Sequence, residues 1–235
     1  MVLFGYCEVE KLGNIKRYSG GRWVDFNDIR KQTNGNLNSK AVVRRMTGGQ
    51  WQVISEERRV DVWNATWSDS YSQDNNIEPD YKVGSRGRMY QGRYGNPDSY
   101  WYGNPWGRQR SLMGFSDSIQ GALSGAKIEK VELYLHIGWA WYWAGAVATI
   151  GVHNFTSKPS RFNHVRYGIK EVRYSSREQG MWITLDNSVG SWFADGSVRG
   201  FTLLKESDDP LYYGHWYGTD GGGEKCPKLR VTYYK

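Results

Sequence analysis

The clearest pattern in the chain is a strict alternation of apolar and polar residues over KIEKVELYLHI. Val131, Leu133, Leu135 and Ile137 occupy every second position, so a β-strand would place them on one face. Shorter runs of the same kind follow, namely ATIGVHNF, WITLDN, FTLLKE and KLRVTYYK, with turn residues between them. No segment has a clear amphipathic helical period. The pattern therefore predicts an all-β fold.

The first 57 residues contain an internal repeat with the signature of a β-hairpin. IKRYSGGRWVDF aligns with VRRMTGGQWQVI 28 residues later, and each copy holds a Gly-Gly pair suited to a type I′ or II′ turn. Such turns place Tyr18 opposite Trp23 and Met46 opposite Trp51, and these four residues are the candidate assembly surface. The intervening KQTNGNLNSK is polar and is expected to be a loop. Hairpins with so little core indicate burial against another chain.

The pattern changes after this repeat, so we expect two domains. Residues 1–57 would form a β-hairpin docking unit, and residues 58–235 a β-sandwich of jelly-roll type built from repeated short strands. VDVWNATWSDSY predicts a strand, and residues 68–88 are expected to be a long loop. SDSIQGALSGA predicts a turn or a single helical turn.

Aromatic residues are the main candidates for a binding surface. The chain holds 12 Trp and 17 Tyr, and sugar rings present apolar faces that stack on such side chains. Five aromatics fall in Gly-, Asn- and Pro-rich segments that look like loops. They would pack beneath the loops, contact a neighbouring chain, or bind a ligand, and we take them as the candidate ligand-binding residues. They are Tyr100, Trp101, Tyr102, Trp106 and Trp216.

A second aromatic cluster, GWAWYWAG, follows the longest predicted strand. Trp139, Trp141 and Trp143 continue the spacing of Ile137, so an uninterrupted strand would place them on the core face. Contact with another chain and a ligand platform remain the alternatives for this cluster.

The net charge of +7 is concentrated at the start of the chain. The first 60 residues hold eleven basic and six acidic residues, a local excess of +5. These charges form neither a run nor a helical stripe. They therefore indicate docking to an acidic protein surface more than binding to nucleic acid.

Residues that could carry catalysis are few. The four histidines are scattered and match no metal-ligand spacing, so no metal or other cofactor is expected. Glycoside cleavage needs two carboxylates in one cleft, and the only acids worth testing are Glu171, Asp208 and Asp209. The sequence thus predicts a protein that is not an enzyme.

The sequence holds no apolar run of about 18 residues, which predicts no insertion into a membrane. A basic start followed by an apolar stretch is missing as well, and Cys7 and Cys226 lie far apart. These features predict synthesis in a cytoplasm.

Four pieces in order carry a family resemblance: RSLMGFS, LSGAKIEKVELYLHI, MWITLDNSVGSWFADGSVRGFTL and CPKLRVTYYK. Together they resemble the DNRLRE-type carbohydrate-binding β-sandwich module. ATWSDSYS, MYQGRYG, IEKVELYLHI and IGVHNFTSKPS are similar to segments of minor tail proteins of tailed phages that infect actinobacteria. The resemblance covers roughly residues 60–235, and GWAWYWAG departs from the module's pattern.

The resemblance implies a non-enzymatic virion component located in the tail, at the tail tip or in a fibre. Its partners would be other tail proteins and copies of itself, with a homotrimer expected from fibre-type packing. Host-envelope glycans are the implied ligand class. The alternatives are a purely structural decoration protein of the head or tail and a cell-wall polysaccharide depolymerase.

Overall fold

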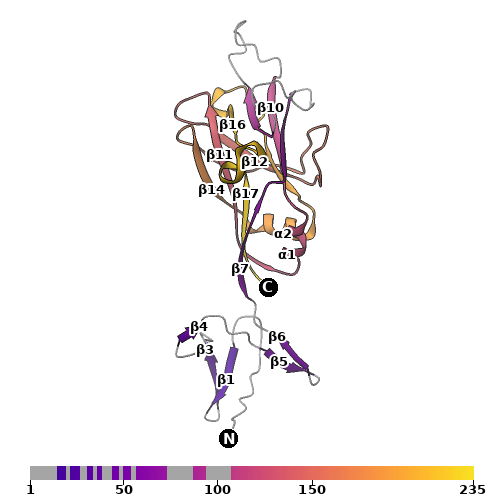
Figure 1. Cartoon of the computed structure of the whole chain (residues 1–235), viewed down its shortest axis with the longest axis vertical. Coiled ribbons are helices and arrows are strands. Elements are labelled where there is room, and N and C mark those ends of the chain that lie inside the picture. Colours follow the sequence, from indigo (N-terminus) through magenta and orange to yellow (C-terminus); the bar gives the residue numbers. More distant parts are fainter. Residues whose placement is uncertain are drawn as a thin grey trace. The chain divides into compact units, whose positions relative to one another are not determined.

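The structure is a computed structural model that describes residues 57–72, 87–93 and 107–235 in full. Before residue 57 it describes six short strands by their backbone pairing. The chain divides into two compact units, Met1–Glu57 and Arg58–Lys235. Figure 1 shows the strands of each unit.

The N-terminal unit contains three separate two-stranded antiparallel sheets. The two hairpins that the repeat predicts are confirmed in their register, because Tyr18 pairs with Trp23 and Met46 pairs with Trp51. The loop expected between them is wrong in part, since its residues form a third hairpin. Asn34-Gly35, a strong hairpin-turn signal, lies between the two strands in the sequence. The strands are β1 (Ile15–Ser19), β2 (Arg22–Phe26), β3 (Lys31–Thr33), β4 (Asn36–Asn38), β5 (Arg44–Thr47) and β6 (Gln50–Val53).

The Arg58–Lys235 unit is mostly β, as the alternation predicts. Its eleven strands form one antiparallel sheet that curls into a half-barrel. They are β7 (Arg58–Asn64), β8 (Trp67–Tyr71), β9 (Met89–Arg93), β10 (Arg108–Gly114), β11 (Lys127–Ala140), β12 (Val147–His153), β13 (Arg166–Arg173), β14 (Gln179–Leu185), β15 (Gly200–Leu203), β16 (Gly214–Trp216) and β17 (Lys228–Tyr234). The expected loop over residues 68–88 is wrong at its start, which belongs to β8.

The sheet has two halves that join through a short contact. The strand order is β13-β12-β15-β10-β9-β16-β11-β17-β7, with β8 also on β10 and β14 also on β11. The link between β9 and β10 consists of two residue pairs, Arg108 with Arg93 and Gln109 with Gly92. Buried residues from both halves belong to one hydrophobic core.

That core contains the predicted face of β11. Val131, Leu133, Leu135 and Ile137 are each fully buried, which confirms the alternation over this strand. They pack with residues from the other half of the sheet, including Ile150 of β12 and Phe201 of β15. Burial of a large aliphatic side chain contributes about 1.5–3 kcal/mol, so this shared core holds the two halves together.

Helices close one end of the core. α1 (Ser118–Leu123) matches the expected single helical turn, and α2 (Asn187–Asp195) lies beside it in Figure 1. α2 was not predicted, although its start and end carry ordinary signals. Asp186 accepts a hydrogen bond from Ser188 N at 2.8 Å, and Gly196 ends the helix with a φ of 77°. The remaining helical turns are η2 (Pro210–Tyr212), η3 (Thr219–Gly221) and α3 (Gly222–Lys225).

Candidate functional site

The five predicted ligand-binding aromatics divide into two groups. Tyr100, Trp101, Tyr102 and Trp106 lie outside the described residues, so their binding role stays a prediction. Trp216 is fully buried in the core, with an edge-on contact to Tyr174 at 6.0 Å between ring centroids.

The prediction that Trp216 belongs to an exposed surface is therefore corrected. Its short segment looks like a loop in the sequence but forms strand β16, which pairs with β9 on one side and β11 on the other. Three residues are too few to show a periodic pattern, and both partner strands are distant in sequence. The burial of Trp216 follows from this insertion between two strands.

The cluster that follows Ile137 is also placed differently from the expectation. Pairing of β11 with β16 shifts register between Ile137 and Trp139, as in a β-bulge. The extra residue moves the alternation by one position. Ala140 is consequently the next fully buried side chain, while Trp139 and Trp141 are only half-buried. Gly138 permits this arrangement, because a β-carbon there would overlap the ring of His215.

The turn after β11 leaves large aromatics in solvent. Trp143 is 80% exposed and Tyr142 is 45% exposed. Together with Trp139, Trp141 and Arg177, they form a cluster that we call the aromatic tip. Exposed aromatic groups of this size on a soluble surface often mark an interaction site.

Arg177 organises the aromatic tip. Its guanidinium carbon lies 4.5 Å from the ring centroid of Trp139 and 4.1 Å from that of Trp143. Its Nη2 also donates a hydrogen bond of 3.1 Å to the carbonyl oxygen of Trp141. Cation–π contacts of this kind contribute about 0.5–2 kcal/mol each. One side chain thus contacts three of the four aromatic residues.

The backbone of the tip is held by neighbouring segments as well. Arg173 Nη2 donates to the carbonyl oxygen of Ala144 at 3.1 Å, and Gly145 N donates to Tyr142 O at 3.1 Å. Gly145 has a φ of 81°, and a β-carbon there would overlap the carbonyl oxygen of Tyr174. Trp143 is therefore exposed on a turn with a defined conformation.

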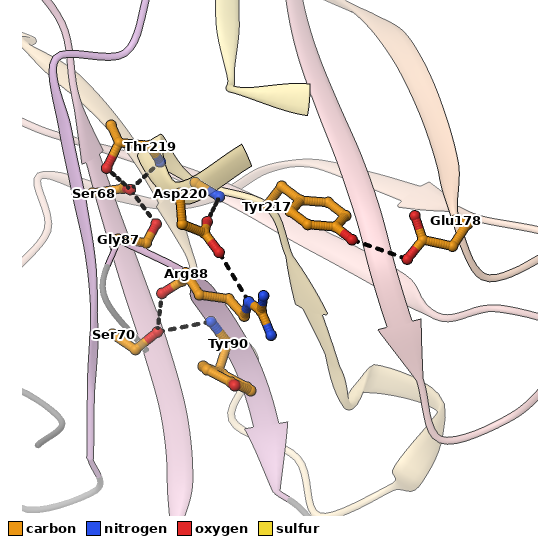
Figure 2. A network of polar contacts seen from close by, with 10 residues as sticks. Ser68, Ser70, Gly87, Arg88, Tyr90, Glu178, Tyr217, Thr219 and Asp220 are labelled. Atoms are coloured by element: carbon orange, nitrogen blue, oxygen red, sulfur yellow. Dashed lines mark hydrogen bonds and ion pairs between the residues drawn. The ribbon is translucent and has the colours of Figure 1, made fainter. Parts of the chain in front are cut away.

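Glu178 shapes the segment that carries Arg177. It has a φ of 51°, a left-handed conformation that costs a non-glycine residue energy. Its carboxylate accepts a hydrogen bond from Tyr217 Oη at 3.1 Å (Figure 2). It also accepts one from Lys225 Nζ at 2.8 Å. Burial opposes ionisation, but these hydrogen bonds and the charge of Lys225 keep the pKa of Glu178 below its usual range. The anchored carboxylate fixes the turn next to Arg177.

The acids singled out for glycoside cleavage are all occupied by other groups. Asp208 accepts a 2.7 Å hydrogen bond from Arg108, which lowers the pKa of its carboxyl. Glu171 accepts from Lys205 at 2.6 Å, and this likewise lowers its pKa. Asp209 caps η2 by accepting from Leu211 N at 2.8 Å. A glycosidase general acid needs a raised pKa, which these ion pairs do not provide.

Comparisons with known proteins leave the family resemblance as a prediction. No protein-family model matches this chain, and no curated protein sequence matches it. Within residues 57–72, 87–93 and 107–235, no three or more His, Cys, Asp or Glu side chains gather closely enough to hold a metal ion. None of the helices that the structure describes is long and apolar enough to cross a membrane.

Proposed function

We propose that this chain is a non-enzymatic component of a phage tail that contacts host-surface glycans through the aromatic tip. In this proposal the Arg58–Lys235 unit is a jelly-roll-type β-sandwich, and residues 1–57 dock it to other tail proteins. The sandwich assignment is supported by the two halves of the sheet that share one core. The tail assignment is supported by the sequence resemblance.

The observation that carries the proposal is an indole that is 80% exposed and yet held in place. The stack on Arg177 orders Trp143 before any ligand arrives. A preordered ring loses little conformational entropy on binding. Stacking of a ring adds about 0.5–1.5 kcal/mol beyond the burial of its area, so one contact is weak. Several copies on one virion would convert such contacts into firm attachment.

Two alternative functions remain, and each has a distinct expectation. A purely structural decoration protein would leave the aromatic tip buried against a virion neighbour, so its loss would affect assembly and not adsorption. A polysaccharide depolymerase would require a carboxylate with a raised pKa. Glu171 and Asp208 have lowered pKa values instead, which favours binding over hydrolysis.

The test compares binding of labelled full-length protein to host cells with binding of two single variants. Trp143→Ala should weaken attachment about fivefold per site, the factor that corresponds to about 1 kcal/mol of lost stacking. Trp182→Ala is the matched control, because this half-buried indole stacks on Arg230 at 4.0 Å outside the tip. Equal binding of wild type and Trp143→Ala would contradict an adhesive role for the tip.

A further inference from the structure

A polar pocket of about 410 Å³ lies on the Arg58–Lys235 unit, and no residue of the aromatic tip lines it. Its volume falls within the range of small-molecule sites, about 300–1,000 Å³. It is lined by Thr66, Trp67, Ser68, Asp69, Gly87, Lys158, Thr219 and Asp220.

Three segments distant in sequence meet at the floor of this pocket. Ser68 of β8 donates a hydrogen bond from its hydroxyl to the carbonyl oxygen of Gly87. The Ser68 hydroxyl oxygen in turn accepts a hydrogen bond from Thr219 N at 2.8 Å, as Figure 2 shows. Gly218 allows this close approach, because a β-carbon there would overlap the Gly87 carbonyl. The floor is thus held by internal contacts and does not need a ligand to form.

The fourth segment reaches the pocket from the connection between β12 and β13. Phe162 of this connection packs against Tyr71 at 6.0 Å between ring centroids, and Tyr71 Oη donates to Pro159 O at 2.8 Å. Phe162 and Tyr71 are both buried. Both contacts lie just C-terminal to Lys158, so they anchor the segment that carries this cation.

Two carboxylates on the pocket wall are each paired with one cation. The Asp69 side chain is only 9% exposed, and its Oδ2 accepts from Lys158 Nζ at 2.9 Å. Asp220 Oδ2 accepts from Arg88 Nε at 3.0 Å (Figure 2). The charges of these two pairs cancel, so the pocket wall does not select strongly for an ion of either sign.

Hydrogen-bonding capacity nevertheless remains in both pairs. An ionised carboxylate has about four acceptor positions, and Asp69 uses one oxygen on Lys158 and the other on Ser70 N. Asp220 similarly receives Arg88 and Gly218 N. The side chain of Lys158 is 48% exposed and carries three N–H donors. Hydrogen-bond acceptors and donors therefore lie side by side on a pocket wall whose charges cancel.

We propose that this pocket binds one neutral, hydroxyl-rich sugar ring. Each sugar hydroxyl both donates and accepts, so adjacent hydroxyls satisfy a carboxylate and the Lys158 ammonium together. An anion would meet two carboxylates, and a cation would compete with Lys158 and Arg88. Trp67, which also lines the pocket, supplies an aromatic surface for the apolar side of the ring. The inference rests on the proposed glycan-contacting function and adds a second contact distinct from the aromatic tip.

The experiment is saturation-transfer NMR on the full-length protein with free sugars, without cells. The probes are glucose, galactose, mannose, arabinose and N-acetylglucosamine, with their methyl glycosides representing a residue within a glycan chain. We expect at least one neutral sugar to bind with a Kd of about 1 mM, the strength of a single weak site. Glucuronate and glucosamine serve as the anionic and cationic comparisons. Binding of the methyl glycoside as well as the free sugar would assign the pocket to a glycan residue, and binding of the free sugar alone would assign it to a free monosaccharide.

The decisive variant is Asp69→Asn/Lys158→Met, which removes both charges of one pair together. It should raise the Kd at least about tenfold, corresponding to about 1.4 kcal/mol. The matched control is Glu171→Gln/Lys205→Met, an ion pair of 2.6 Å that does not line the pocket. Thermal unfolding verifies that each variant is folded. Thr66→Trp fills the pocket while keeping both ion pairs and should also abolish binding.

Three results would overturn the inference. They are the lack of binding by every neutral probe, binding that survives both Asp69→Asn/Lys158→Met and Thr66→Trp, and a preference for glucuronate or glucosamine. The proposed adhesive role fails separately, because Trp143→Ala is measured on cells. If a sugar binds in the pocket and Trp143→Ala attaches to cells as the wild type does, the adhesive role of the aromatic tip is contradicted and sugar binding in the pocket is supported.

Discussion

The two units of this protein are built from strand pairs of very different range. In the N-terminal unit the described strands form three hairpins of consecutive strands, as in the pairing of Tyr18 with Trp23. In the Arg58–Lys235 unit the first strand, β7, pairs with the last, β17, so that Asn64 lies opposite Lys228. Pairing of strands that are close in sequence costs little loop-closure entropy but buries little apolar surface. Pairs between strands distant in sequence enclose a core, and from this difference we expect the N-terminal unit to need a partner and the larger unit to be stable alone.

Removing residues 1–57 is the strongest way to break this comparison. All described pairings of β7 through β17 lie within the remaining unit, so the truncated protein should fold and unfold at an unchanged temperature. It should fail completely to join the virion, because the hairpins with their candidate assembly residues would be missing. Incorporation into purified particles measures this directly, and normal incorporation would refute the docking role.

The same pair of proteins tests the expected homotrimer. Light scattering should give a trimer for the full chain and a monomer for the truncated one, because the hairpins are predicted to bury their apolar surface between copies. A full-length monomer at micromolar concentration would contradict this arrangement.

A substitution in the core, compared with one at the aromatic tip, should show which region contributes most to the free energy of unfolding. Trp216→Ala removes a fully buried indole from the core and should lower the free energy of unfolding by about 3–5 kcal/mol. Trp143→Ala removes an indole that is 80% exposed and should change it by less than about 1 kcal/mol. Denaturant titration of both variants measures the difference. Similar losses in the two would mean that the aromatic tip is structural.

Acid should destabilise the larger unit selectively, because all four histidines lie in it. Burial lowers the pKa of His153 to about 4, although its hydrogen bond to Met113 O opposes the shift. Burial and the charge of Arg88 likewise lower the pKa of His215 to about 4. The unfolded chain takes up these protons near its ordinary pKa of 6.5, and the folded one does not.

The stability contributed by neutral His153 is therefore present above pH 6.5 and is lost as the pH falls from 6.5 to 4. The loss should reach about 3 kcal/mol for this residue. Thermal unfolding across this range measures it, and His153→Gln should flatten the curve. A wild-type midpoint that stays constant from pH 6.5 to 4 would contradict the burial of neutral histidine.

Particular residues show how far the sequence could predict the candidate site. The aromatic cluster after Ile137 can be recognised in the sequence. The face of the sheet on which it lies cannot, because one bulge between Ile137 and Trp139 reverses the alternation. The partner that orders it, Arg177, follows β13 and has no motif that links it to Trp143. The pocket residues Ser68 and Asp69 fell in an expected loop. The only local indication that these two residues belong to a strand is the segment WSDSY. Its polar residues are buried because segments distant in sequence pack against them.

What the sequence determined by itself is the local and periodic part of the structure. Alternation over KIEKVELYLHI specifies the buried face of β11, and Gly-Gly spacing specifies the register of two hairpins, since both depend on neighbours within a few residues. The tertiary structure alone decided that Trp216 is buried and that Trp143 is exposed while it stacks on Arg177. It also decided that Ser68 and Thr219 are joined by a hydrogen bond. These outcomes depend on which distant strands lie side by side, and no period within a single segment encodes that choice.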